Sequence, residues 1–423
     1  MHCDHFLSQR CRSCSLLDLT YSESLQQKLD VLTQLFPQTP IRPFVECSEV
    51  CGSRIRAKLA VTGSVELPTI GFYDDQQNIV AVDDCPLHHA LINEFTTRLP
   101  AIIHEARLTP YDMTTDSGEL KFVVLTCSPT HNQLMVQFVL RSREAIDRIR
   151  SLWRKMTDAD KQSIAFLSVN LQPVRSSTIA GPDEIAISDQ TRLPIRFGDT
   201  ELLFGPQSFL QTNYEVATSL YAAAGRLLQD YSADSVLDLY CGAGAFSLTA
   251  ASQARSVVGI DISANAIACA QEAADPRSRA PALERNAPEA PASTLLPGRQ
   301  EPPEQPVPRQ EPRNKNIILH REQYNRTNAQ FLCRSLEEFT AAELATHNFD
   351  TVICNPPRRG LDAASVTLIQ SLKPRLIVYS SCNAKTLQRD AKLLSSNYRL
   401  EYLQPFDMFP FTNHFEVLAA FTV

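Results

Sequence analysis

The segment SVLDLYCGAGAF, residues 235–246, decides the fold of the C-terminal half of this chain. An apolar run ends around Asp238 and leads into a loop that holds Gly242 and Gly244. A second apolar run, SVVGID, ends at Asp261, 23 residues after Asp238. Apolar strands that alternate with helices in this way predict a parallel, doubly wound α/β sheet. The glycines would let a ligand approach the backbone where the first strand ends.

The spacing of the glycines bears on which ligand this loop would hold. It follows G-x-G-x-x-S, so the third glycine of a dinucleotide fingerprint is absent. Asp261 stands at the end of the second strand, where an acidic side chain can accept hydrogen bonds from a ribose diol. Together these features are typical of an S-adenosylmethionine (SAM) site. A plain tight turn in an α/β sheet is the alternative.

Three further motifs stand where later strands of this sheet should end. NPPRRG (355–360) follows DTVIC, and Arg358 takes the place where methyltransferases of exocyclic amines carry an aromatic residue. This favours a substrate with an anionic or carbonyl edge. Cys382 follows RLIVYSS, and a nearby cation such as Arg358 would lower its pKa and make its thiol a nucleophile. Glu416 enters the last strand and would serve as a general base.

Each of these motifs alone also has a plain structural explanation. The N-P-P turn could be an ordinary loop, Cys382 a buried filler and Glu416 an edge-strand charge. We favour the nucleophile because Cys382 would share one sheet edge with the SAM loop and Arg358.

Residues before about 200 show a different pattern. Apolar residues at helical spacing predict helices over 21–36 and 143–162, and alternation over 54–82 predicts strands. Together they indicate a mixed α+β region. We therefore expect three parts: a cysteine-rich head with the start of a β-rich region (1–90), a central α+β region (91–200) and the α/β domain (201–423).

The stretch 275–313 does not fit the α/β pattern that surrounds it. It holds ten of the chain's 27 prolines, with alanine, glutamate, arginine and glutamine between them. Such a composition cannot pack a core, so we expect a disordered surface loop. A long insertion is tolerated between a helix and a strand, because the entropy of closing a loop grows slowly with its length.

Composition excludes several classes of protein. Hydrophobic residues make up 43% and charged residues 21%, which is ordinary for a globular chain. No apolar run approaches the ~20 residues of a membrane span, and the first residues lack the apolar core of a signal peptide. Asp and Glu (47) outnumber Lys and Arg (40), for a net charge of −7. Any contact with nucleic acid must therefore use local basic patches.

One candidate for such a patch lies on a predicted strand. Arg54, Arg56 and Lys58 alternate there, so all three should face one side of the sheet. They form a candidate row of phosphate contacts. A solvated face is the commoner explanation for charges in this pattern.

Twelve cysteines in a chain without an export signal favour metal ligation or catalysis over disulfides. Three crowd the first 14 residues and a fourth precedes a proline: Cys3, Cys11, Cys14 and Cys85. Four thiolates fit an iron–sulfur cluster, and structural zinc is the rival. Spacing alone leaves the fourth ligand open, because Cys47 and Cys51 compete with Cys85.

Five longer motifs point to one family of enzymes. They are PQSFLQTN (206–213), DLYCGAGAF (238–246), NPPRRG (355–360), YSSCNAKT (379–386) and DMFPFTNHFEV (407–417). With them, nearly the whole chain resembles the RNA uracil-C5 methyltransferases that use SAM. The compact N-terminus and the segments GSRIRAKLAVTGSVELPTIGF and CPLHHA are similar to the family's 23S ribosomal RNA enzymes. The insertion 275–313 has no expected counterpart in this family.

The resemblance implies a mechanism and a set of ligands. Cys382 would add to C6 of a flipped uracil, C5 would take the methyl group of SAM, and Glu416 would remove the C5 proton. Four positions match the family's SAM contacts: Gln211, Tyr240, Asp261 and Asn355. Four cysteines match its [4Fe-4S] ligands: Cys3, Cys11, Cys14 and Cys85.

The resemblance also sets the expected partners. We expect a cytoplasmic monomer whose partner is 23S ribosomal RNA, contacted by the central region, with no DNA or membrane contact. Methylation of a transfer RNA uridine or another ribosomal uridine is the alternative within the family, since the motifs follow the reaction and discriminate substrates poorly. A non-catalytic RNA-binding iron–sulfur protein is the alternative outside it. The presence of both Cys382 and Glu416 argues against that reading.

Overall fold

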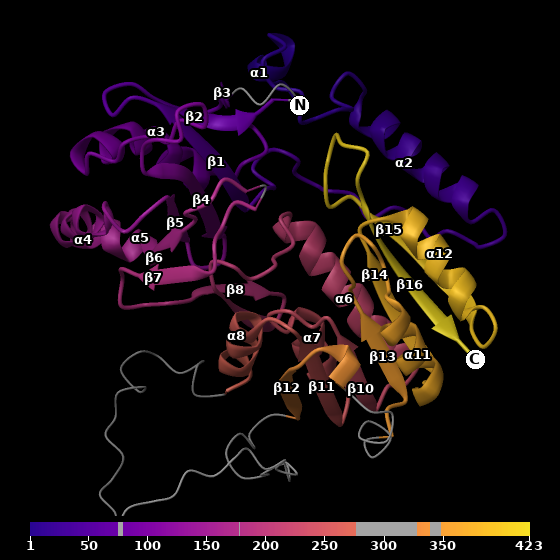
Figure 1. Ribbon diagram of the computed structural model, residues 1–423. Coiled ribbons are helices and arrows are strands. Elements are labelled where there is room, and N and C mark those ends of the chain that lie inside the picture. The colour runs from indigo at the N-terminus through magenta and orange to yellow at the C-terminus, as the bar shows by residue number, and fades with distance from the viewer. Residues whose placement is uncertain (75–78, 177, 276–327, 339–347) are drawn as a thin grey trace, which may run out of the picture.

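The structure is a computed structural model that describes residues 1–74, 79–176, 178–275, 328–338 and 348–423 (Figure 1). The proline-rich stretch lies outside the described residues from residue 276 onward, and its predicted disorder stays a prediction. No helix in the described part is long and apolar enough to cross a membrane.

A seven-stranded sheet forms the C-terminal half of the molecule. Its strands, in spatial order, are β12 (Ala329–Cys333), β11 (Ser256–Asp261), β10 (Ser235–Leu239), β13 (Thr351–Cys354), β14 (Leu376–Ser381), β16 (Glu416–Thr422) and β15 (Arg399–Phe406). The first five run parallel to one another, which confirms the predicted α/β fold. Their carboxyl ends therefore meet at one edge of the sheet.

The sheet is not parallel throughout. β16 runs antiparallel to both β14 and β15. The connection from β15 to β16 spans only residues 407–415, and a parallel pair needs a crossover of a dozen residues or more. This short loop brings Glu416 back to the edge where β14 ends.

Helices cover both faces of this sheet, and successive residues of each strand point to alternate faces. Val236 belongs to one apolar core, while Leu237 and Leu239 belong to the other. The first core is closed by α6 (Tyr214–Asp230), α7 (Ala245–Ala251) and α8 (Ala264–Ala274). The second is closed by α11 (Ala363–Leu372), α12 (Ala384–Leu394) and α2 (Tyr21–Leu35).

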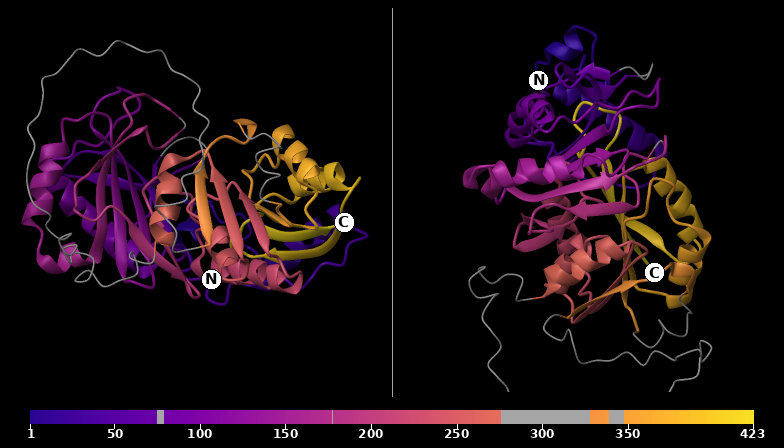
Figure 2. Two further views of the ribbon diagram at one scale, coloured as in Figure 1. Left: turned by 90° about the horizontal axis from the view of Figure 1, so that it is seen from below. Right: turned by 60° about the vertical axis from the view of Figure 1, so that its left-hand side comes forward.

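A second seven-stranded sheet forms the N-terminal half, and the left view of Figure 2 shows its purple strands beside the orange and yellow strands of the first sheet. Its spatial order is β3 (Ile79–Ala81), β2 (Pro68–Tyr73), β1 (Arg56–Gly63), β4 (Leu120–Ser128), β5 (Gln133–Leu140), β6 (Ile164–Leu171) and β7 (Asp183–Ala186). Strands from both sides of residue 90 pair here, so this sheet crosses the boundary expected at that position. A two-stranded ribbon, β8 (Leu193–Phe197) and β9 (Thr200–Phe204), leads to α6.

Four helices in the described residues belong to the N-terminal half, and one prediction for them is wrong. Besides the short α1 (Asp4–Leu7) in the head, they are α3 (Ala90–Glu105), α4 (Ile146–Lys155) and α5 (Asp158–Ser163). The single helix predicted over 143–162 is wrong, because it is interrupted at Met156. Thr157 then adopts an extended conformation and its side chain accepts a hydrogen bond from the Asp160 amide, so it begins a new helix.

The helix α2 leaves the N-terminal half and packs on the C-terminal sheet domain, beside α12 (Figure 1). A capping box between Thr20 and Glu23 begins it. Its buried side includes Lys28, whose Nζ lies 2.5 Å from Asp407 Oδ1. The Tyr21 hydroxyl donates to the other oxygen of Asp407 at 2.7 Å. These contacts fix the loop 407–415 against α2.

Candidate active site

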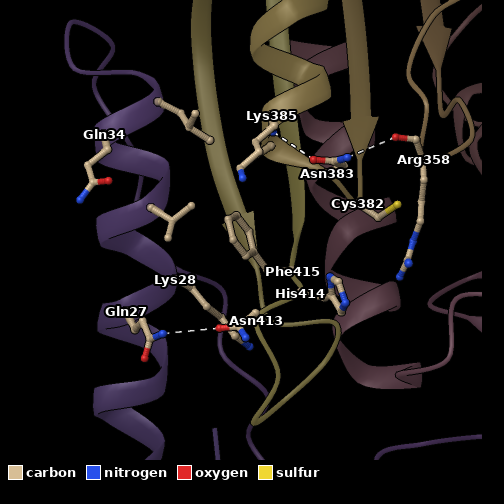
Figure 3. Close-up of a pocket in the computed structure, with 13 residues that line it drawn as sticks. Gln27, Lys28, Gln34, Arg358, Cys382, Asn383, Lys385, Asn413, His414 and Phe415 are labelled. Carbon is tan, nitrogen blue, oxygen red and sulfur yellow. Dashed lines mark hydrogen bonds between the residues drawn. The ribbon is translucent and has the colours of Figure 1, made fainter. Parts of the chain in front are cut away.

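Cys382 lies at the carboxyl end of β14 and lines a cavity of about 760 Å³ (Figure 3). The cavity is formed by three groups of residues: Gln27, Lys28, Val31, Gln34 and Leu35 of α2, Arg358 with Cys382 to Lys385, and Asn413 to Phe415. The two catalytic motifs and the NPPR turn therefore meet at one place, as expected from the strand ends. The wall formed by α2 was not expected from the sequence.

Two charged side chains act on the Cys382 thiol. Burial and then the Glu416 carboxylate raise its pKa above 9.0, whereas a hydrogen bond and the charge of Arg358 lower it. The backbone carbonyl of Arg358 accepts a hydrogen bond from Asn383 Nδ2 at 3.3 Å, which holds the turn beside the cysteine. Arg358 thus acts in the predicted direction, but burial and Glu416 outweigh it.

Glu416 is buried at the start of β16, with 1% of its surface exposed. Ser380 donates its hydroxyl to Oε1 at 2.6 Å, and Oε2 is buried with no hydrogen-bond partner in the described residues. Burial raises the pKa of Glu416 from 4.5 to about 7. A carboxyl group with one unpartnered oxygen and a pKa near neutrality suits a general base.

The raised pKa of Glu416 predicts a pH effect on stability. The folded state binds this proton up to about pH 7 and the unfolded state only up to about pH 4.5, so the free energy of unfolding falls as pH rises across that window. The loss is about 3 kcal/mol, from 1.36 kcal/mol per pH unit. We expect Glu416→Gln to lose correspondingly less stability than the wild type between pH 5 and pH 8. Urea unfolding of both proteins at the two pH values measures this, and equal losses would contradict it.

The glycine loop after β10 adopts backbone conformations that favour glycine. Gly242 has φ +55° and Gly244 φ +84°. A Cβ on Gly244 would lie 3.1 Å from Phe331, whereas one on Gly242 would point into open space. The Gly242 amide donates to Asp261 Oδ2 at 2.9 Å. The loop thus leaves room for a ligand beside Gly242.

The strand-end residues proposed for SAM lie on three neighbouring strands. Tyr240 follows β10, Asp261 ends β11 and Asn355 follows β13. Asp261 accepts two backbone amides, from Gly242 and from Ser263 at 2.8 Å, and its further lone pairs can accept ribose hydroxyls. The Tyr240 hydroxyl lies 2.5 Å from Ser365 Oγ, which fixes its ring.

The fourth expected SAM contact, Gln211, lies in the loop before α6. Its side chain is buried (3% exposed) and makes no hydrogen bond within the described residues. The same loop packs on α8, the helix that follows Asp261, where Ser208 Oγ lies 3.6 Å from Cys269 Sγ. Phe209 in this loop is 64% exposed. It was missed as a candidate, although an exposed aromatic ring can stack on a base.

The structure brings four cysteines of the head together. Burial first, and then its neighbouring thiols, raise the pKa of Cys14 to about 12; these neighbours are Cys85, Cys11 and Cys3. All twelve cysteines lie in the described residues, and none forms a disulfide. The two cysteines that compete with Cys85 as the fourth ligand are not among these neighbours. Cys47 is buried and accepts a hydrogen bond from Asn213 at 3.2 Å, and Cys51 is exposed.

Hydrogen bonds tie the first residues of the chain to both halves of the molecule. His5 Nε2 lies 2.5 Å from Asp84, the residue before Cys85. The Leu16 amide, just after Cys14, donates to the carbonyl of Phe411 at 2.9 Å. Because Phe411 lies in the loop 407–415, the head is directly linked to the loop that precedes Glu416.

Comparison with known proteins identifies the family. The model described as tRNA (Uracil-5-)-methyltransferase matches residues 20–278 and 314–420. A Yersinia enterocolitica protein named 23S rRNA (uracil(747)-C(5))-methyltransferase RlmC is 34% identical over 421 residues, 99% of each chain. The chain belongs to the tRNA (uracil-5-)-methyltransferase family. A protein of the same name from Yersinia pestis (strain Pestoides F) is 34% identical over 427 residues, 100% of each chain.

A solved structure agrees with this family. The Pyrococcus abyssi tRNA (uracil-54, C5)-methyltransferase, in complex with S-adenosyl-L-homocysteine, has 25% sequence identity and a TM-score of 0.71. The match covers 97% of this chain and 85% of that one. The family model leaves out residues 279–313, which lie within the proline-rich insertion.

The loop 206–213 explains why the expected row of phosphate contacts is wrong for Arg56. Its guanidinium donates to the carbonyls of Pro206 at 2.6 Å and Ser208 at 2.7 Å, and burial lowers its pKa to about 10. Arg56 therefore joins β1 to the loop that carries Gln211. The alternation of residues along the strand predicts that Arg54, Arg56 and Lys58 share a face. It cannot show that the loop 206–213 packs on Arg56. Lys58, further along, is exposed.

Proposed function

We propose that this chain catalyses the SAM-dependent methylation of C5 of one uridine in 23S ribosomal RNA, giving 5-methyluridine. The uridine is 747 in the numbering used in the names of the relatives. The observation that carries the proposal is the meeting of Cys382, Arg358 and Glu416 at one sheet edge, because a thiol, a cation and a buried base are what C5 methylation needs. Full-length similarity to two such enzymes supports the choice of RNA.

The reaction proceeds through a covalent adduct, because C5 of uracil is a poor nucleophile. The Cys382 thiol first loses its proton to solvent, a step that the positive charge of Arg358 favours. The thiolate then forms a bond to C6, and the electron pair of the C5–C6 double bond moves into an enolate. C5 then takes the methyl group of SAM. Glu416 removes the remaining proton from C5, and the sulfur leaves C6 as the double bond returns. SAM leaves as S-adenosyl-L-homocysteine, and the protonated Glu416 returns its proton to solvent.

SAM would be held across three neighbouring strand ends. Asp261 would accept its ribose hydroxyls, Tyr240 and Asn355 would line the site, and Gln211 would bring a free side-chain amide to it. The open space beside Gly242 and the remaining lone pairs of Asp261 support this placement. When bound, SAM supplies an electrophilic methyl group.

Asp261→Ala tests this placement. It removes the acceptor for the ribose and the two backbone hydrogen bonds that shape the loop, so we expect the affinity for SAM to fall by about tenfold or more, as for a charge-assisted hydrogen bond. Titration calorimetry with SAM measures this. Asp234→Ala is the matched control, because Asp234 precedes β10 at the opposite edge and pairs with Arg255. Equal affinity in Asp261→Ala would contradict the site.

We also propose that the four cysteines of the head hold a [4Fe-4S] cluster. The grouping of the other three thiols around Cys14 supports a shared metal group. Four thiolates fit such a cluster, and structural zinc is the rival. The match of these four positions to the family's cluster ligands favours the cluster.

Cys14→Ser tests the cluster. We expect the anaerobically purified variant to lose iron and its head to be cut by protease at lower concentration, because metal binding contributes to folding. Cys51→Ser is the control and should keep its iron, since Cys51 is not among the four grouped thiols. Iron retained in Cys14→Ser, or zinc found in the wild type, would contradict the assignment.

A methyl-transfer assay tests the proposed function as a whole. Purified protein is incubated with labelled SAM and either unmodified 23S ribosomal RNA or unmodified transfer RNA, and the labelled nucleoside is identified. We expect 5-methyluridine at one site of 23S RNA. Label only in transfer RNA would overturn the substrate, and no label in either would overturn the enzymatic function. We propose further that the protein acts in the cytoplasm as a monomer and that residues 91–200 contact the RNA. Residues 1–90 would hold the cysteine-rich head and the start of the β-rich region, and residues 201–423 would form the catalytic domain.

A further inference from the structure

The cavity beside Cys382 extends away from the cysteine as a groove between two helices. Gln27, Val31 and Gln34 stand on one face of α2, at spacings of four and three residues, and all line the groove. The facing wall is the start of α12, where Lys385 projects (Figure 3). The opposite face of α2 is buried against the sheet domain, so the groove is a fixed part of the fold.

The size of this cavity exceeds what the target base needs. Cavities of about 300–1,000 Å³ bury ligands of drug size, and this one measures about 760 Å³. A single flipped pyrimidine fills only part of that volume. Room remains for a second nucleotide next to the uracil.

The charge of the lining favours a phosphate group. None of the lining residues is acidic, although the chain as a whole carries a net charge of −7. The two acidic residues of α2 do not line the groove and accept hydrogen bonds from other residues. Glu23 accepts one from Thr20, and Asp30 accepts one from Gln26. A surface without carboxylates in an acidic protein attracts an anionic ligand.

Of the three basic residues that line the groove, Lys385 is available for a ligand. Lys28 is 2% exposed and bound to Asp407, and Arg358 acts on Cys382. Lys385 is exposed and makes no ion pair within the described residues. It stands in the first turn of α12, where a cation opposes the helix dipole, so its charge does not stabilise the helix.

We propose that this groove binds the nucleotide adjacent to the target uridine, with Lys385 bound to its phosphate and the polar face of α2 against its base. The proposal rests on the proposed function and assigns α2 a place in RNA recognition. It gives the first helix of the chain a direct role beside the catalytic cysteine.

Binding of an RNA hairpin that contains the target uridine tests the groove. Dissociation constants are measured at several salt concentrations for the wild type, Lys385→Ala and Lys392→Ala, with S-adenosyl-L-homocysteine present. We expect Lys385→Ala to bind about tenfold more weakly and to lower the salt slope by about one, as for one lost phosphate contact. Lys392 is exposed in the last turn of the same helix and should have no effect.

A second pair of measurements assigns the contact to one phosphate. Methylphosphonate is placed on either side of the target uridine. We expect one of the two substitutions to weaken wild-type binding and to have no further effect on Lys385→Ala. On α2, Gln34→Ala should weaken binding, and Gln26→Ala, which lies off the groove, should not.

Two results would overturn the groove assignment while leaving the proposed function intact. One is an unchanged dissociation constant for Lys385→Ala in a protein that methylates the hairpin. The other is a loss of affinity in Lys385→Ala that adds in full to the loss caused by each of the two methylphosphonate substitutions. A wild-type protein that neither binds nor methylates the hairpin would overturn the proposed function, and the groove with it.

Discussion

Cys382→Ala is expected to abolish methyl transfer, with a loss of at least about 10⁴-fold in rate, as for removal of the nucleophile from other enzymes that use one. Without the sulfur no bond forms at C6, so C5 never gains the electron density that attacks the methyl group of SAM. Incorporation of label into RNA measures the rate. Cys382→Ser should be nearly as inactive, because a hydroxyl ionises far less readily than a thiol and is a poorer nucleophile.

Binding measurements separate this loss from a loss of fold. Cys382→Ala should bind SAM and RNA with wild-type affinity, since the side chain is small and lies at the end of β14. Cys333→Ala, which removes an exposed thiol at the end of β12, should retain activity. Methylation at a wild-type rate by Cys382→Ala would overturn the mechanism.

Glu416→Gln is expected to stall the reaction after methyl transfer. Glutamine cannot accept the C5 proton, so the methylated uridine stays bonded to Cys382 and a protein–RNA adduct accumulates that survives denaturation. Turnover should fall by about 10²–10⁴-fold, the usual contribution of a general base. Denaturing electrophoresis with labelled RNA measures the adduct.

The pH dependence of the rate gives an independent test of Glu416. Burial raises its pKa to about 7, and only the carboxylate can accept a proton, so the wild-type rate should fall as pH drops below about 7. Glu401 lies on the neighbouring edge strand β15, so Glu401→Gln should show the same dependence of rate on pH as the wild type. Turnover by Glu416→Gln at the wild-type rate, without adduct, would assign the base to another residue.

The edge of the C-terminal sheet could be predicted from the sequence because its motifs follow strands. Carboxyl ends of parallel strands meet at one edge of a sheet, so Asp261 and Asn355 are expected at the same edge without knowledge of side-chain contacts. Cys382 and Glu416 meet for a different reason. The short loop 407–415 forces β16 to run antiparallel beside β14, which brings its first residue to the same edge.

The wall formed by α2 could not be predicted in the same way. Periodicity indicated an amphipathic helix, but it does not say on which domain a helix packs. Lys28 is an example. A charged side chain on the buried face of a helix contradicts the amphipathic pattern, and only its ion pair with Asp407, far away in sequence, explains it. Arg56 shows the same limit on a strand, because the loop that covers it lies about 150 residues away.

The most direct test of the central claim is the identity of the residue that bonds to uracil. RNA with 5-fluorouridine at the target position is incubated with the protein and SAM. Fluorine at C5 cannot be removed by a base, so the adduct should persist through digestion to peptides. Mass spectrometry should find the methylated, fluorinated nucleotide on the peptide that contains Cys382. The nucleotide on any other residue, or no adduct from an active preparation, would contradict the account.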